Sequence, residues 1–160
     1  MIRTGEDGMV PEIAREPHPG AEPMTSHEPD YRNLVEAARN RKAVILPFYE
    51  HFVAAEMMAA VLDTTMVLDP KDRDSIRPFY REYCRFWREM EYDTVSFEAG
   101  ICGLLPGHGA IFGAKPGPIQ SREDFARYPF GEFEGRYWEF WRPHLDAIRE
   151  FMPEGMKAVG

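Results

Sequence analysis

The sequence predicts an α/β fold, in which helices alternate with the strands of a parallel sheet. Short strand-like runs occur at residues 43–46, 93–97 and 156–159, and helical patterns lie between them. The first run, Ala-Val-Ile-Leu, is apolar throughout, which is typical of a parallel strand covered on both faces. Strands that alternate with helices form βαβ units with right-handed crossovers.

Residues 1–29 precede the first helical pattern and contain five of the fourteen prolines. They show no sustained apolar period, so they cannot bury enough surface to offset the entropy lost on ordering. The start of the chain also lacks the apolar core of a secretory signal. We expect an irregular extension over residues 1–29 and one folded domain over residues 30–160.

The first part of this domain reads as a helix, a strand and a second helix. Apolar side chains recur at helical spacing over residues 30–40, and strong helix formers fill residues 53–62. Between them, residues 43–46 form the first expected strand, which Pro47 ends.

An apolar stripe marks the clearest helix of the chain. Its members are Ile76, Phe79, Tyr80, Tyr83, Phe86, Trp87 and Met90. Such a stripe is typical of a face packed on the core, and we favour that interpretation over an aromatic platform for a cofactor. Cys84 lies in the same helix and is expected to be a small buried hydrophobe.

The second part begins with a strand over residues 93–97 and a loop over residues 100–120 rich in glycine and proline. Loops this long inside a compact domain are often functional. Ser121 to Asp124 matches a capping box, so a short helix is expected there. A longer helix follows over residues 133–152, kinked or split at Pro143, before the strand-like run at residues 156–159.

The net charge of −8 disfavours nonspecific binding to phosphates, so we expect no nucleic-acid groove. The longest compact apolar stretch, residues 43–48, is too short to span a bilayer, so we expect no membrane-bound protein. The two cysteines show no metal-ligand spacing and no disulfide framework, which favours a reducing cytoplasm. We expect no metal site, because a pair formed by Cys102 and His108 would lack further ligands.

Five segments, in this order and spacing, resemble the uroporphyrinogen decarboxylase superfamily. They are RKAVILPFYEHF (41–52), FYREYCRFWREMEYDTVSFE (79–98), LPGHGAIFG (105–113), PIQSREDFARYPF (118–130) and MPEGMKAVG (152–160). The resemblance implies the N-terminal part of a (β/α)8 TIM barrel with a helical lead-in. Such a barrel usually takes about 250 residues. We therefore expect a truncated chain that is inactive alone and can form a homo-oligomer through its open barrel edge.

The superfamily implies two chemistries. Its decarboxylases are lyases that remove carboxylates from a porphyrinogen without a cofactor. Its methyltransferases move methyl groups between corrinoid proteins and thiols, with zinc held by His and Cys ligands late in the chain. The expected partner is accordingly a small-molecule tetrapyrrole or a corrinoid protein. Corrinoid and zinc would serve only a full-length methyltransferase, and no cofactor is expected within this chain. The alternative is a non-catalytic module that binds a tetrapyrrole or a partner that completes the barrel.

Two departures from the decarboxylase pattern favour the methyltransferase-like or a divergent branch. Residues 48–51 read Phe-Tyr-Glu-His where decarboxylases carry Arg-Gln-Ala-Gly-Arg, so the guanidinium groups suited to carboxylates are missing. Residues 96–98 read Ser-Phe-Glu where decarboxylases carry Phe-Ser-Asp, so Glu98 would hold pyrrole N–H groups only after a shift in register.

The candidate site residues follow the first two expected strands, where barrel active sites lie. Glu50, His51 and Glu98 are the candidate catalytic residues, and Phe48, Tyr49 and His108 are candidate substrate contacts. An imidazole beside a carboxylate can act as an acid–base pair. The alternatives are a helix cap for Glu50 beside an exposed His51, a surface carboxylate for Glu98, and a turn residue for His108.

Overall fold

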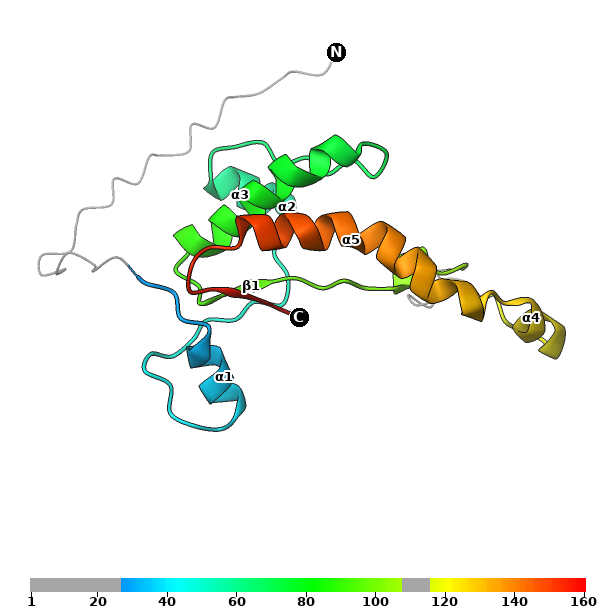
Figure 1. Cartoon of the computed structure of the whole chain (residues 1–160), viewed down its shortest axis with the longest axis horizontal. Helices are drawn as coiled ribbons and strands as arrows, with labels where there is room; N and C mark the ends of the chain where they lie inside the picture. Colours follow the sequence, from blue (N-terminus) through cyan, green and yellow to red (C-terminus); the bar gives the residue numbers. More distant parts are fainter. Residues whose placement is uncertain (1–26, 108–115) are drawn as a thin grey trace, which may run out of the picture.

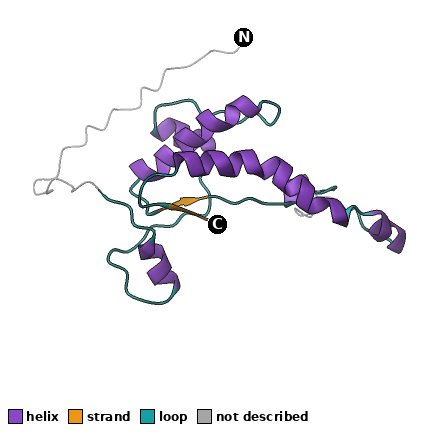
Figure 2. Cartoon of the chain, in the orientation of Figure 1, coloured by secondary structure: helices purple, strands orange, loops and turns teal. Residues whose placement is uncertain are grey.

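The computed structural model describes residues 27–107 and 116–160, in which helices predominate and a small parallel sheet joins them (Figures 1 and 2). The helices are α1 (Arg32–Ala38), α2 (Ala55–Val61), α3 (Ile76–Glu89), α4 (Arg122–Arg127) and α5 (Phe133–Phe151). The strands are β1 (Thr94–Ser96) and β2 (Lys157–Val159), and short 3-10 turns lie at Arg73–Ser75, Cys102–Leu104 and Phe130–Glu132. In Figure 1, α2, α3 and α5 lie above the strands and α1 lies below them.

β1 and β2 form a parallel pair, as the order of strands and helices in the sequence predicts. Val95 lies opposite Ala158, and the amide of Phe97 extends the ladder by donating to the carbonyl oxygen of Val159 at 2.8 Å. A Cβ atom at Gly160 would lie 2.3 Å from the carbonyl oxygen of Phe97, so only glycine allows this approach at the strand ends. The carboxyl ends of both strands therefore meet at one edge.

The strand predicted over residues 43–46 is wrong, because residues 41–50 contain neither helix nor strand. The amide of Val44 donates to the Asn33 side-chain oxygen at 3.2 Å rather than to a neighbouring strand. Val44 and Leu46 are 93% and 84% exposed, so the apolar run has no layer to cover it here. A run of this kind gains little from pairing when neither of its faces becomes buried.

The helix predictions are confirmed. α3 packs against α5, and the apolar stripe of α3 is buried except at the half-buried Tyr83 and the exposed Met90. The helix expected over residues 133–152 is not split, since α5 continues through Pro143 as a single helix. Ser121 caps α4 by accepting a hydrogen bond from the amide of Asp124 at 3.1 Å, as the capping box predicts.

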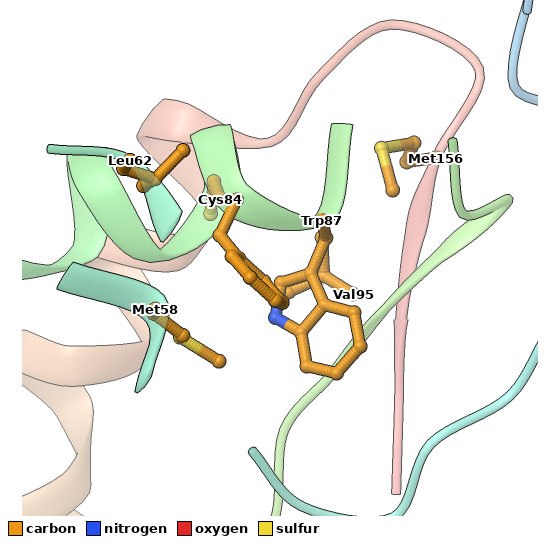
Figure 3. Packing of buried hydrophobic residues seen from close by; sticks show 7 residues of the cluster. Met58, Leu62, Cys84, Trp87, Val95 and Met156 are labelled. Atoms are coloured by element: carbon orange, nitrogen blue, oxygen red, sulfur yellow. The ribbon is translucent and has the colours of Figure 1, made fainter. Parts of the chain in front are cut away.

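The core lies between α2, α3 and the sheet. One buried cluster consists of Met58, Leu62, Cys84, Phe86, Trp87, Val95 and Met156 (Figure 3). A second buried cluster joins α3 to α5 and consists of Ile76, Phe79, Tyr80, Ala147 and Ile148. Cys84 is a buried free thiol in the first cluster, which confirms its expected role as a small hydrophobe.

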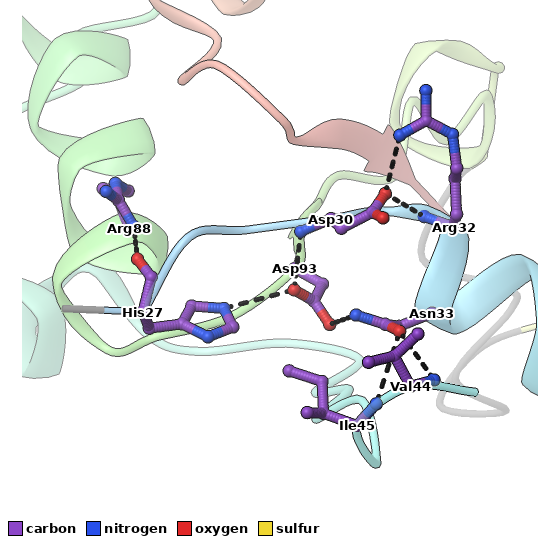
Figure 4. A network of polar contacts seen from close by, with 8 residues as sticks. All are labelled: His27, Asp30, Arg32, Asn33, Val44, Ile45, Arg88 and Asp93. Carbon is purple, nitrogen blue, oxygen red and sulfur yellow. Dashed lines mark hydrogen bonds and ion pairs between the residues drawn. The ribbon is translucent and has the colours of Figure 1, made fainter. Parts of the chain in front are cut away.

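The buried carboxylate of Asp93 ties the start of the described chain to the beginning of β1 (Figure 4). It accepts hydrogen bonds from the Asp30 amide at 2.8 Å and from the Asn33 side-chain amide at 3.1 Å. His27 Nε2 lies 3.1 Å from the same carboxylate, and Arg88 donates to the His27 carbonyl oxygen. Residues 27–29 of the expected extension are thus irregular but anchored, whereas residues 1–26 lie outside the described residues.

No helix within residues 27–107 and 116–160 combines the length and the apolar character needed to cross a lipid bilayer.

Candidate functional site

Two of the candidate catalytic residues meet just beyond the carboxyl end of β1. His51 Nδ1 lies 3.0 Å from Glu98 Oε1, and their side chains are 70% and 51% exposed. The hydroxyl of Ser96 donates to the carbonyl oxygen of Glu50, which holds the segment before His51 beside the end of β1. The pair is therefore positioned by backbone contacts, while its polar atoms stay open to solvent.

The remaining candidate residues lie apart from this pair. The Glu50 side chain is exposed, and its charge adds to burial in raising the pKa of Tyr92, so it faces the region before β1. Phe48 also contacts Tyr92, edge to face, with 6.2 Å between ring centroids. Tyr49 is 45% exposed, and His108 lies outside the described residues.

The contact between His51 and Glu98 forms part of the rim of a hollow of about 810 Å³ between α3 and α5. Its lining consists of His51, Phe52, Leu68, Phe79, Tyr80, Tyr83, Ser96, Phe97, Glu98, Phe140, Trp141 and His144. Two hydrogen bonds fix its walls to the end of β1. The Tyr83 hydroxyl donates to the Ser96 carbonyl oxygen at 2.5 Å, and Trp141 Nε1 donates to the Gly100 carbonyl oxygen at 2.9 Å.

A second polar pair, which was not predicted from the sequence, lies in this hollow. His144 Nδ1 lies at hydrogen-bond distance, 3.2 Å, from the Tyr80 hydroxyl, and both residues are buried. Burial lowers the pKa of His144, while burial and then the nearby Tyr83 and Cys84 raise the pKa of Tyr80. Both groups are therefore uncharged near neutral pH. The sequence pattern that could have indicated the position of His144 is helical spacing, because His144 follows Trp141 by three residues and therefore lies on the same face of α5.

The donor set of the hollow does not fit a zinc ion. Across residues 27–107 and 116–160, no group of three or more His, Cys, Asp or Glu side chains could hold a metal. His51 and Glu98 would supply only two ligands, whereas protein zinc sites use three or four. We therefore assign these two side chains no role as zinc ligands.

Comparison of the chain with protein-family models, curated proteins and solved structures finds no match. A carboxylate can accept hydrogen bonds from substrate N–H groups, and an imidazole beside it can take up or release a proton near neutral pH. The exposed contact between His51 and Glu98 provides both groups at one point.

Proposed function

We propose that this chain forms the N-terminal part of a (β/α) barrel of the uroporphyrinogen decarboxylase superfamily. In this proposal the complete protein acts in the cytoplasm on a tetrapyrrole or on a corrinoid-linked methyl group. The observation that carries it is the contact between His51 and Glu98 at the carboxyl end of a parallel strand. Active sites of (β/α) barrels lie at that end of the strands, and the packing of α3 against α5 and β1 supports the proposal.

In this proposal Glu98 accepts hydrogen bonds from substrate N–H groups, and His51 exchanges a proton with the substrate. In a decarboxylation, the bond from the substrate carbon to its carboxylate breaks, carbon dioxide leaves, and a proton takes its place on that carbon. His51 is exposed enough to return such a proton from solvent. Residues 48–51 contain no guanidinium group to hold several carboxylates, which favours the methyltransferase-like or divergent branch.

The test is a substitution that removes only the charge of Glu98. In the complete protein, Glu98→Gln should lower kcat/KM about 100-fold or more, because an amide oxygen accepts hydrogen bonds from substrate N–H groups less well than a carboxylate does. Two activities are measured: porphyrin products formed from uroporphyrinogen, and loss of the methyl group from methylcobalamin in the presence of a thiol.

The matched control is Glu154→Gln, since Glu154 is exposed and lies before β2, away from the site. It should leave either activity within about twofold of the unaltered protein. A folded gene product that is inactive in both assays, or a Glu98→Gln protein of full activity, would contradict the proposal.

A second candidate function is a non-catalytic module that a partner completes. The observation that favours it is the apolar segment beside β1, where Val44, Leu46 and Phe52 are 93%, 84% and 76% exposed. Exposed apolar patches often mark interaction surfaces. In this case the segment would pair with a second copy of the chain or with a chain that supplies further strands.

A further inference from the structure

The hollow between α3 and α5 has the size and the wall of a small-molecule site. Its volume of about 810 Å³ falls in the range typical of ligand pockets. Phe79, Tyr80 and Tyr83 reach it from α3, and Phe140 and Trp141 reach it from α5. A wall in which aromatic rings predominate favours a flat, conjugated ligand, because such a ligand can stack on ring faces and meet ring edges.

The rings of the wall contact one another, which lowers the cost of ordering them around a ligand. Phe97 lies edge to face with Tyr80 and with Trp141, with centroids 5.9 Å and 5.6 Å apart. His144 stacks on Phe140 with a centroid distance of 5.1 Å. Because the side chains already fix one another, binding loses little side-chain entropy.

The polar part of the wall is the contact between Tyr80 and His144. One hydroxyl and one neutral imidazole give this part of the hollow both a hydrogen-bond donor and an acceptor. Neither group carries charge near neutral pH, because burial disfavours the imidazolium and the phenolate. The pair can orient a ligand that carries a ring nitrogen or a carbonyl oxygen.

The charge of the lining restricts the ligand further. Among the described residues, neither Lys nor Arg lines this hollow, and its one carboxylate, Glu98, already contacts His51. His51 can become a cation when protonated, but it already contacts Glu98, so an anionic ligand would be desolvated here without a free cation to compensate it. The lining therefore disfavours molecules that carry several carboxylates, phosphates or sulfonates.

We propose that the hollow between α3 and α5 is a binding site for an uncharged, planar heteroaromatic molecule that hydrogen-bonds to the Tyr80–His144 pair. The inference stands apart from the proposed function, because Tyr80, His144 and the ring wall carry it rather than the catalytic role of Glu98. A protein that lacks both proposed enzyme activities can still bind such a molecule.

The experiment uses lumichrome, an uncharged tricyclic heteroaromatic compound, as the probe. Titration into the chain should quench tryptophan fluorescence with a Kd of about 10–100 μM, as expected for a small rigid ligand. Trp141→Phe should abolish most of the quenching, whereas Trp138→Phe should retain it, because Trp138 does not line this hollow. Pyrenetetrasulfonate, a planar polyanion, should bind at least about tenfold more weakly.

The polar pair is tested by Tyr80→Phe, which removes one hydroxyl and keeps the ring. Its Kd for lumichrome should rise about fivefold, the effect of one hydrogen bond. A separate measurement needs no variant: nuclear Overhauser contacts should join lumichrome protons to the ring protons of Phe79 and Phe140. Absence of binding below about 1 mM, contacts elsewhere on the protein, or equal affinity for the polyanion would each overturn the proposal.

Discussion

Asp93 is the residue through which the start of the described chain is joined to the sheet. Its carboxylate is 2% exposed and is surrounded by the Asp30 amide, the Asn33 side-chain amide and the His27 imidazole. Buried charges are tolerated only when hydrogen bonds or opposite charges compensate them. The contacts of Asp93 therefore serve the fold at the amino end of β1, at the other end of this strand from the candidate site.

We predict that Asp93→Asn lowers the free energy of unfolding by about 2 kcal/mol, because its new amide donors would face existing donors. The matched control, Asp63→Asn, should change stability by less than about 0.5 kcal/mol, since Asp63 is exposed and asparagine tolerates its positive φ of 47°. Urea unfolding followed by far-ultraviolet circular dichroism measures both. Equal urea midpoints for the two variants would show that the contacts of Asp93 do not stabilise the fold.

Cys84 gives a prediction about alkaline pH. Burial raises the pKa of its thiol from 9.0 to about 12, so the folded protein keeps a proton that the unfolded chain loses. Stability contributed by this thiol is therefore complete below about pH 9 and declines as the pH rises toward about 12. At about pH 10.5 the loss should be roughly 2 kcal/mol relative to pH 8.

The measurement is urea unfolding of the unaltered chain and of Cys84→Ala at both pH values. The difference between the two pH dependences gives the loss due to Cys84, including its effect on the pKa of the nearby Tyr80 and Tyr83. The contributions of ionising groups that Cys84 does not influence cancel. If both proteins lose the same stability between these pH values, the thiol of Cys84 is not protected by burial.

At the scale of the elements, two glycines show how position decides the effect of one substitution. Gly155 has a φ of +80°, and a Cβ atom there would lie 2.0 Å from the carbonyl oxygen of Pro29. Gly135 lies in the first turn of α5, and a Cβ atom there would meet no atom within 4 Å. Gly155 thus serves the turn before β2, whereas Gly135 only weakens a helix.

We predict opposite effects on stability at these two positions. Gly155→Ala should cost about 2 kcal/mol or more, because alanine strains at positive φ and would clash with the backbone. Gly135→Ala should add about 0.5 kcal/mol, since alanine favours a helix. Thermal melting should show a lower Tm for Gly155→Ala and a higher Tm for Gly135→Ala. A change of Tm in the same direction for both variants would contradict the role given to Gly155 in the turn.

The elements also differ in how well the sequence predicted them. The stripe of α3 combines many apolar residues at one spacing, so its helix follows from local pattern alone. The run at residues 43–46 has equal apolar character, but a strand forms only where another strand offers its edge. The amide of Val44 meets the Asn33 side chain instead, and no local pattern could have indicated that contact.

At the scale of the whole molecule, the exposed apolar segment beside β1 should promote association. We predict that Leu46→Lys raises the Kd of self-association about tenfold or more, because a charge would have to be buried in the contact. Val67→Lys is the control, since Val67 is 61% exposed in another part of the chain. Size-exclusion chromatography with light scattering distinguishes the species, and an unaltered chain that is monomeric at about 100 μM would exclude this contact.

Some residues of the candidate site could be predicted from the sequence, and others could not. Glu98 could be placed from the sequence because it follows β1, and barrel active sites lie at that end of the strands. The reason given for His51 was wrong, because the strand expected before it does not form, and the hydrogen bond from Ser96 to the Glu50 carbonyl oxygen brings His51 to the end of β1 instead. The meeting of Tyr80 with His144 could not be predicted, because it depends on how α3 and α5 pack. Phe48 and Tyr49 follow the same expected strand as His51, yet neither lines the hollow.

The sequence by itself determined the helices, the positions of β1 and β2, their parallel order and the buried stripe of α3, because spacing and apolar character act locally. Only the tertiary structure decided that residues 43–46 stay unpaired, that Asp93 gathers three partners, and that Tyr80 and His144 share one hollow. These features depend on contacts between distant segments, and such contacts leave no periodic trace in the sequence.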